Sequence, residues 1–207
     1  MRISVVKAAK LHLYDIEFDD GSVGAIDKTV WEHSGYREGD EIDPHQWEAL
    51  FTLSQTHRAR EKALYYLSLR DYGVGELVQK LCRAGISREL AQETVSRLEQ
   101  SGLIDDERYA AALARDMSQR KLYPKRRIAA ALREKGFSSE AIENALSELV
   151  EEDEKQALEL LIKKGYNGKS EAVSYEKWLA KLARYGFSYG ASKRAFDLWD
   201  ELYADEE

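Results

Sequence analysis

Residues 81–87 are LCRAGIS, residues 132–138 are LREKGFS and residues 182–188 are LARYGFS. Each stretch has a leucine, a glycine four positions later, an apolar residue and then a serine. Glycine just after a last helical turn adopts the left-handed conformation that ends the helix, and serine accepts hydrogen bonds from the free N–H groups of the next helix. The pattern predicts three helix–turn–helix units. Their structural residues, four positions apart in each unit, are Leu81 and Gly85, Leu132 and Gly136, and Leu182 and Gly186.

The similarity extends beyond these stretches. At nine, ten and thirteen positions after the glycines stand Thr94, Val95 and Leu98, then Ala145, Leu146 and Leu149, then Ala195, Phe196 and Trp199. In front of each unit, apolar residues at helical spacing predict one more helix: Ala59, Ala63 and Leu67, then Tyr109 and Leu113, then Ala157 and Leu161. The sequence therefore predicts a mainly α-helical fold of three tandem three-helix repeats, in an elongated curved array. We expect the aromatic residues Trp178, Phe187, Phe196 and Trp199 in the core of the third repeat.

A short α/β segment is expected before the repeats. Residues 1–27 alternate as strands do, and Asp19 to Ser22 have the composition of a hairpin turn. Asp43 and Pro44 are typical of a helix N-cap and first helical residue, and we expect that helix to end at about Ser54. The predicted domains are an N-terminal α/β segment at 1–56, repeat 1 at 57–104, repeat 2 at 105–150 and repeat 3 at 151–207.

Composition restricts the class of protein. No apolar stretch approaches the roughly 20 residues that cross a bilayer, and the single cysteine, Cys82, cannot form an internal disulfide. We therefore expect a cytoplasmic protein, and a monomer. The net charge of −7 argues against a protein that coats nucleic acid, although it is unevenly distributed.

A basic cluster lies between Arg115 and Gly136. Its eight cations are Arg115, Arg120, Lys121, Lys125, Arg126, Arg127, Arg133 and Lys135, with Tyr123 among them and only two acids. The cluster is either an ordinary solvated helix face or a contact face for DNA phosphates or an acidic protein surface. Together with Tyr123, Arg70 and Arg108, the cations from Arg115 to Arg127 are our candidate partner-binding or DNA-binding residues.

No pattern in the sequence indicates catalysis. Asp105 and Asp106 suit a helix start, where acids satisfy free N–H groups, better than a metal or acid–base site; partner contact is the remaining alternative. The four histidines show no metal-ligand spacing, and the phosphate-loop, nucleophile-elbow and Cys-x-x-Cys motifs are absent from the sequence. We expect no enzymatic activity, no cofactor and no metal.

Several of these residues resemble a known family. Arg70, GEL at 75–77, Leu81 with Gly85, and above all LEQSGLIDDERYA at 98–110 are similar to the RecX family of recombination regulators. The sequence departs from that pattern at Tyr123, where a glycine is expected before Pro124. The resemblance covers nearly the whole chain.

This resemblance implies a partner and an activity. It implies binding to a RecA-type recombinase filament, along its helical groove and in contact with single-stranded DNA inside it, and inhibition of ATP hydrolysis, strand exchange and coprotease function. The alternative hypothesis is a nucleic-acid-binding helical repeat module that uses the basic face of residues 115–136.

Overall fold

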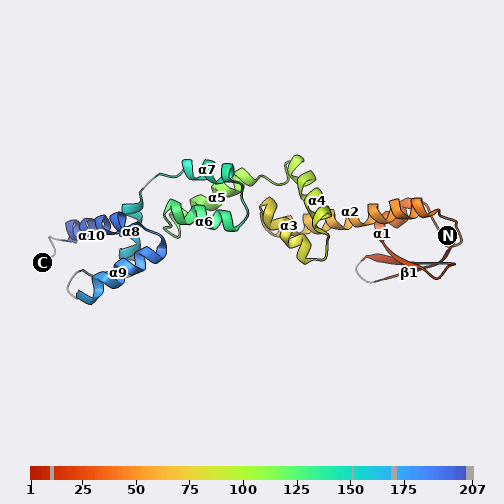
Figure 1. Ribbon diagram of the computed structural model, residues 1–207, viewed down its shortest axis with the longest axis horizontal. Coiled ribbons are helices and arrows are strands. Elements are labelled where there is room, and N and C mark those ends of the chain that lie inside the picture. The colour runs from red at the N-terminus through yellow and green to blue at the C-terminus, as the bar shows by residue number, and fades with distance from the viewer. Residues whose placement is uncertain (10–11, 151, 169–171, 204–207) are drawn as a thin grey trace. The chain divides into compact units, whose positions relative to one another are not determined.

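The computed structural model describes residues 1–9, 12–150, 152–168 and 172–203. Within these ranges the chain is mostly helical, with helices α1 to α10 and one three-stranded sheet (Figure 1). The chain divides into two compact units, each described by itself below. The first unit contains Met1–Tyr72 and Leu77–Leu103, and the second contains Gly73–Glu76 and Ile104–Glu207.

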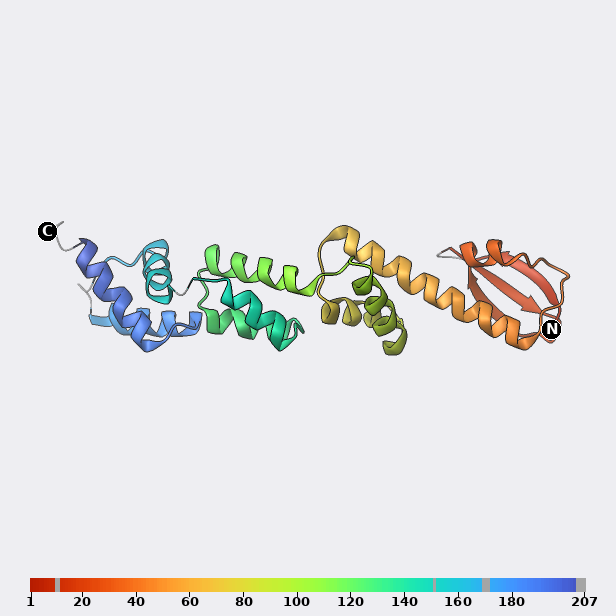
Figure 2. The same cartoon turned by 90° about the horizontal axis from the view of Figure 1, so that it is seen from above.

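The first unit begins with an antiparallel sheet in the order β1-β2-β3. The strands are β1 (Ile3–Ala8), β2 (Leu13–Phe18) and β3 (Val23–Asp27). Figure 2 shows them beside α1 (Lys28–Ser34) and the start of α2 (Pro44–Leu69). The predicted hairpin turn is confirmed, because the N–H of Phe18 donates to the Ser22 carbonyl oxygen and Gly21 has a φ of +81°. A small core that includes Ile16, Ile26 and Trp31 fixes the helices on the sheet.

Helix α2 (Pro44–Leu69) is longer than the sequence analysis predicted. Its start is confirmed, since Asp43 and Gln46 form a capping box in which each side chain bonds the other residue's backbone N–H. The predicted end near Ser54 is wrong, because no proline or glycine follows Pro44 inside the helix and nothing breaks it before Leu69. One continuous helix therefore contains residues 56 and 57, on either side of the predicted boundary between the N-terminal segment and repeat 1.

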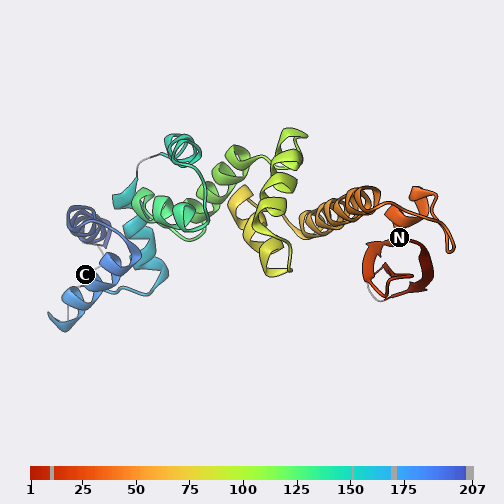
Figure 3. The ribbon, with the colours of Figure 1, turned by 45° about the vertical axis from the view of Figure 1, so that its right-hand side comes forward.

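The helices follow the predicted three-helix repeats. Repeat 1 consists of the end of α2, α3 (Val74–Arg83) and α4 (Arg88–Gln100). Repeat 2 consists of α5 (Asp106–Gln119), α6 (Lys125–Glu134) and α7 (Ser139–Ser147). Repeat 3 consists of α8 (Asp153–Lys163), α9 (Ala172–Tyr185) and α10 (Tyr189–Tyr203), which Figure 3 shows in cyan to blue.

The predicted turns are confirmed in all three repeats. Gly85, Gly136 and Gly186 have φ values of +87°, +88° and +101°. The N–H of the residue after each glycine donates to the carbonyl oxygen of the leucine five positions before it, at 3.2 Å in each case. The serine that follows accepts from a backbone N–H of the next helix, at 3.1 Å for Ser138 and Ser188. Each turn therefore closes a helix and caps the next one.

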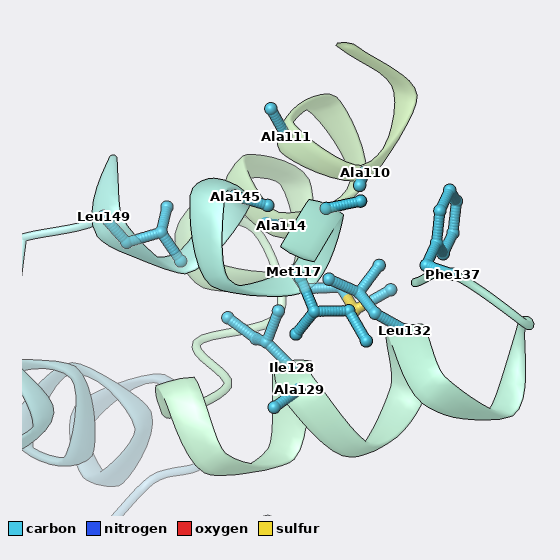
Figure 4. Close-up of a cluster of buried hydrophobic side chains, with 12 residues drawn as sticks. Ala110, Ala111, Ala114, Met117, Ile128, Ala129, Leu132, Phe137, Ala145 and Leu149 are labelled. Carbon is cyan, nitrogen blue, oxygen red and sulfur yellow. The ribbon is translucent and has the colours of Figure 1, made fainter. Parts of the chain in front are cut away.

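Small and large side chains interlock in the core of repeat 2. Ala110 and Ala114 of α5 lie against Ile128 and Leu132 of α6, and Phe137 closes one end (Figure 4). Repeat 3 has its own core, which includes Leu161, Leu182 and Phe196. The expected apolar positions after each glycine are buried or partly buried, as a packed repeat requires.

Candidate functional site

The first turn of α6 carries three successive cations. Pro124 is the N-cap residue and supplies no side-chain hydrogen bond, and Lys125, Arg126 and Arg127 follow with no acid in the turn. Positive charge at a helix N-terminus is unfavourable, because the free N–H groups there are already partly positive. The first turn of α6 therefore contains no acidic side chain that would offset the three positive charges.

The other cations of the basic cluster are not equivalent. Arg115 pairs with Glu148 at 2.9 Å and Arg120 pairs with Asp116 at 3.1 Å. In the described part of the chain, no carboxylate lies within ion-pair distance of Lys121, Lys125 or Arg126. Among the described residues, the structure thus separates two ion-paired arginines from three cations that have no acidic partner.

Arg127 connects repeat 2 to repeat 3. Its Nη1 donates to the carbonyl oxygens of Tyr185, at 3.1 Å, and Arg184, at 3.4 Å, which lie at the end of α9. Its guanidinium also lies 3.7 Å from the centre of the Tyr123 ring. A cation at a helix C-terminus is stabilising, so Arg127 has a favourable role within the chain itself.

Leu122 makes a second connection between these repeats. It lies in the loop between α5 and α6, with a φ of +55°, yet its side chain is buried in the core of repeat 3 beside Leu161 and Leu182. Nearby, the amide of Gln156 donates to the Ser118 hydroxyl at 2.7 Å. The start of α6 is therefore held against repeat 3 by packing and by hydrogen bonds.

A groove opens where these repeats meet. It has a volume of about 820 Å³ and is lined by Tyr123, Arg127, Lys177, Trp178, Ala180, Lys181, Arg184 and Tyr185. Two of these residues were candidates from sequence, whereas the cations of α9 were missed. Their signal is the spacing of Lys177, Lys181 and Arg184, four and then three positions apart, which places them on one side of a helix.

The remaining candidate arginines lie elsewhere. Arg70 follows α2 in the first unit, where its guanidinium stacks 3.7 Å from the centre of the Tyr72 ring. Arg108 is exposed in the first turn of α5 in the second unit. The structure gives neither residue a place in the groove.

The side chains of Asp105 and Asp106 both accept hydrogen bonds from backbone N–H groups. Asp105 caps α5 by accepting from the Arg108 N–H at 2.9 Å, and Asp106 Oδ1 accepts from the Val74 N–H at 2.8 Å. Burial raises the pKa of the Asp106 carboxyl above its usual value, although the Val74 hydrogen bond opposes this shift. Among the residues that the structure describes, no three His, Cys, Asp or Glu side chains are placed to hold a metal ion.

Over the described ranges, every helix is too short or too polar to span a membrane.

Comparison with known proteins identifies the family. Residues 59–98 match the model of the first three-helix domain of RecX, and residues 105–146 match that of the second. The chain is 30% identical over 217 residues to the regulatory protein RecX of Streptococcus gordonii, covering all of this chain and 80% of that protein. It is 27% identical to the regulatory protein RecX of Caldanaerobacter subterraneus, covering 84% of this chain and 89% of the relative. A crystal structure of regulatory protein RecX superposes with a TM-score of 0.67 at 28% identity, covering 95% of this chain and 98% of the other. The chain therefore belongs to the RecX family of regulatory proteins.

Proposed function

We propose that the chain binds a RecA-type recombinase filament and inhibits its ATPase, strand-exchange and coprotease activities. The family relationship supports a regulatory role, and the resemblance noted above names the filament as the partner. The observation that carries the proposal is the charge of Lys121, in the loop before α6, and of Lys125 and Arg126 in its first turn, which no carboxylate of the described residues compensates. Cations that repel one another without local compensation suit an anionic partner surface.

Repeats offer a physical route to inhibition. Each repeat is one three-helix unit with its own exposed surface, so several modest contacts to neighbouring protomers can add up to tight binding. A chain that bridges protomers restrains their opening and closing, and this motion accompanies ATP hydrolysis in the filament. In this proposal the chain acts by binding and carries out no chemistry.

The decisive experiment measures ATP hydrolysis by a RecA-type recombinase on single-stranded DNA, with increasing amounts of the purified chain. We expect hydrolysis to slow until the filament is saturated. Binding is measured in parallel on recombinase-coated strand and on the bare strand, and we expect much tighter binding to the coated strand. Unchanged hydrolysis at saturating chain would contradict the proposal.

The alternative, a nucleic-acid-binding module that uses residues 115–136, predicts a different result in the same assay. The chain would then bind bare DNA as tightly as coated DNA, with an affinity that falls steeply as salt rises. The ion pairs of Arg115 and Arg120 leave fewer cations available for this face than the sequence suggested.

A further inference from the structure

The groove at the meeting point of repeats 2 and 3 has an unusual charge for this chain. Four of its eight lining side chains are cations, namely Arg127, Lys177, Lys181 and Arg184, and none is an acid. Lys177, Lys181 and Arg184 belong to the segment 151–207, whose net charge is −4, so these three cations are gathered against the local trend. A groove of this kind raises the local concentration of anionic ligands.

The cations of α9 differ from other cations of the same unit in their acidic neighbours. Within the residues that the structure describes, no carboxylate lies within ion-pair distance of Lys177, Lys181 or Arg184. Other cations of the same unit do have such partners: Arg194 pairs with Glu201 at 3.3 Å, and Lys155 pairs with Glu152 at 2.6 Å. The groove therefore keeps a set of uncompensated charges on one side of one helix.

Aromatic rings are interleaved with these charges. Trp178 is half-buried, and the Lys181 ammonium lies 3.8 Å from the centre of its ring. One edge-on neighbour, Tyr166, holds the indole from the core side at 5.6 Å. A planar base can take the position over the indole that the flexible ammonium now occupies, while the ammonium turns to a phosphate.

We propose that this groove binds single-stranded nucleic acid, with phosphates at Lys177, Lys181 and Arg184 and a base stacked on Trp178. Combined stacking and backbone charge are the means by which proteins bind single strands without reading their sequence. A duplex presents its own concave grooves and is recognised by a protruding helix or ribbon, so a concave protein surface suits a single strand better. An acidic protein segment would satisfy the cations and leave the rings without a role.

Arg127 is a positioning residue in this proposal. It holds Tyr123 and the end of α9 together, and a Cβ at Gly186 would lie only 3.1 Å from the Arg127 Cβ. Its bonds to the Tyr185 and Arg184 carbonyls fix the two walls of the groove. We therefore leave Arg127 unchanged in the test.

The test measures binding of a fluorescent oligothymidylate of about 15 nucleotides to the full chain by anisotropy, with no recombinase present. The variant K177A/K181A removes two groove cations. The matched control K164A/K193A removes two lysines that are exposed in the same repeat and do not line the groove. We expect roughly tenfold weaker binding for the groove variant and little change for the control. The salt slope should fall by about 1.4 in the groove variant, since each phosphate contact on a single strand contributes about 0.7.

A second readout places the base on Trp178. The strand should quench tryptophan emission of the parent chain, and W178F should lose that quench while its affinity changes by less than about threefold, because phenylalanine still offers a ring for stacking. Equal weakening in the two lysine variants, or a quench that persists in W178F, would overturn the proposal. So would equal binding of thymidine triphosphate, of duplex or of polyglutamate, which would point to a free nucleotide, duplex DNA or an acidic protein.

This inference stands apart from the proposed function. The assay contains no recombinase, so a failure here leaves filament inhibition untouched. Conversely, if the chain fails to slow the recombinase ATPase, its binding to the labelled strand is unaffected by that result.

Discussion

Gly136 ends α6 with a φ of +88°, and a Cβ built there lies 3.5 Å from the Cα of Gly75. The left-handed conformation costs an L-residue about 1–2 kcal/mol, because its Cβ approaches the following carbonyl oxygen. Gly190, in the first turn of α10, has an ordinary helical φ and open space around the same position. The backbone conformation at Gly136 therefore favours glycine, whereas neither the conformation nor the surroundings of Gly190 do so.

We expect Gly136→Ala to lower the free energy of unfolding by about 1–2 kcal/mol. Gly190→Ala should be neutral or stabilising by up to about 1 kcal/mol, because alanine is the better helix former. Denaturant unfolding followed by circular dichroism compares the two variants with the parent. Equal midpoints for the two variants would mean that Gly136 is not held in the left-handed conformation.

Single residues also show how far sequence reasoning reaches. The caps at Gly85, Gly136 and Gly186 were predictable, because the donor and the acceptor of each hydrogen bond that forms them are at most five positions apart in the chain. Leu122 was not, because the core that buries it belongs to the next repeat and no local pattern marks a leucine with positive φ. The role of Arg127 was missed for the same reason, since its acceptors lie 57 and 58 residues away.

Leu122→Ala should therefore destabilise the second unit by about 2–5 kcal/mol, through the cavity left in the core of repeat 3. Leu202→Ala is the control, since that leucine is 61% exposed and its loss should change stability by less than about 0.5 kcal/mol. Thermal unfolding of the parent and of both variants measures the effect. If both variants unfold with the parent, the contact between repeats 2 and 3 is not formed in solution.

At the scale of elements, the start of α5 is tied to a segment that precedes it in the chain. Asp106 accepts from the Val74 N–H, and the carboxyl is partly buried by this contact. Burial penalises the charged form, which is why the pKa of Asp106 is raised. Because this pKa is higher in the folded chain than in the unfolded chain, Asp106 stabilises the fold fully when the pH is below the unfolded-state pKa. This contribution is lost as the pH rises through the folded-state pKa.

The variant D106N tests this sign. An asparagine keeps a carbonyl oxygen for the Val74 N–H and has no charge to desolvate, so the stability of D106N relative to the parent should be greater at pH about 7 than at pH about 3. E107Q removes the same charge from an exposed position in the same turn and corrects for the general effect of net charge. Thermal midpoints of the three proteins across this range give the comparison. A relative stability of D106N that falls as the pH rises would show that the carboxylate is stabilised in place.

Elements also explain the limits of the site prediction. Helical period and caps located α6 and α9 as separate helices, but the groove exists only because their ends meet. Trp178 was predicted as a core residue, and it does pack on the core of repeat 3 while its other side lines the groove. A periodicity of 3.6 residues shows that a side chain lies on the apolar face of a helix. It does not show whether a side chain at the border of that face is covered by another helix or lines a groove.

At the scale of the whole molecule, charge is the feature with most bearing on function. Residues 1–55 have a net charge of −6, residues 56–150 of +3 and residues 151–207 of −4. The positive middle segment includes the α6 cations, and acidic segments on both sides disfavour long tracts of bare DNA. This distribution favours a partner that combines protein and nucleic acid, as a recombinase filament does.

The last prediction separates the partner-binding cations from the structural one. K125A/R126A should fold as the parent does or be slightly more stable, because it removes like charges from a helix N-terminus. R127A should lower the melting temperature, because it removes the hydrogen bonds to the end of α9 and the stacking on Tyr123. We expect K125A/R126A to inhibit the recombinase ATPase about tenfold less well than the parent at low salt, which corresponds to about 1.4 kcal/mol of binding free energy.

The control for this experiment is again K164A/K193A, which removes the same charge from outside the α6 start and should inhibit like the parent. Raising the salt should narrow the gap between K125A/R126A and the parent, since screening weakens the interaction that the substitutions remove. Equal inhibition by the parent and K125A/R126A at low salt would show that these cations form only a solvated surface. The contact with the filament would then have to lie on the other repeats, and the exposed residues of repeat 1, with Arg70 beside Tyr72, would be the next to change.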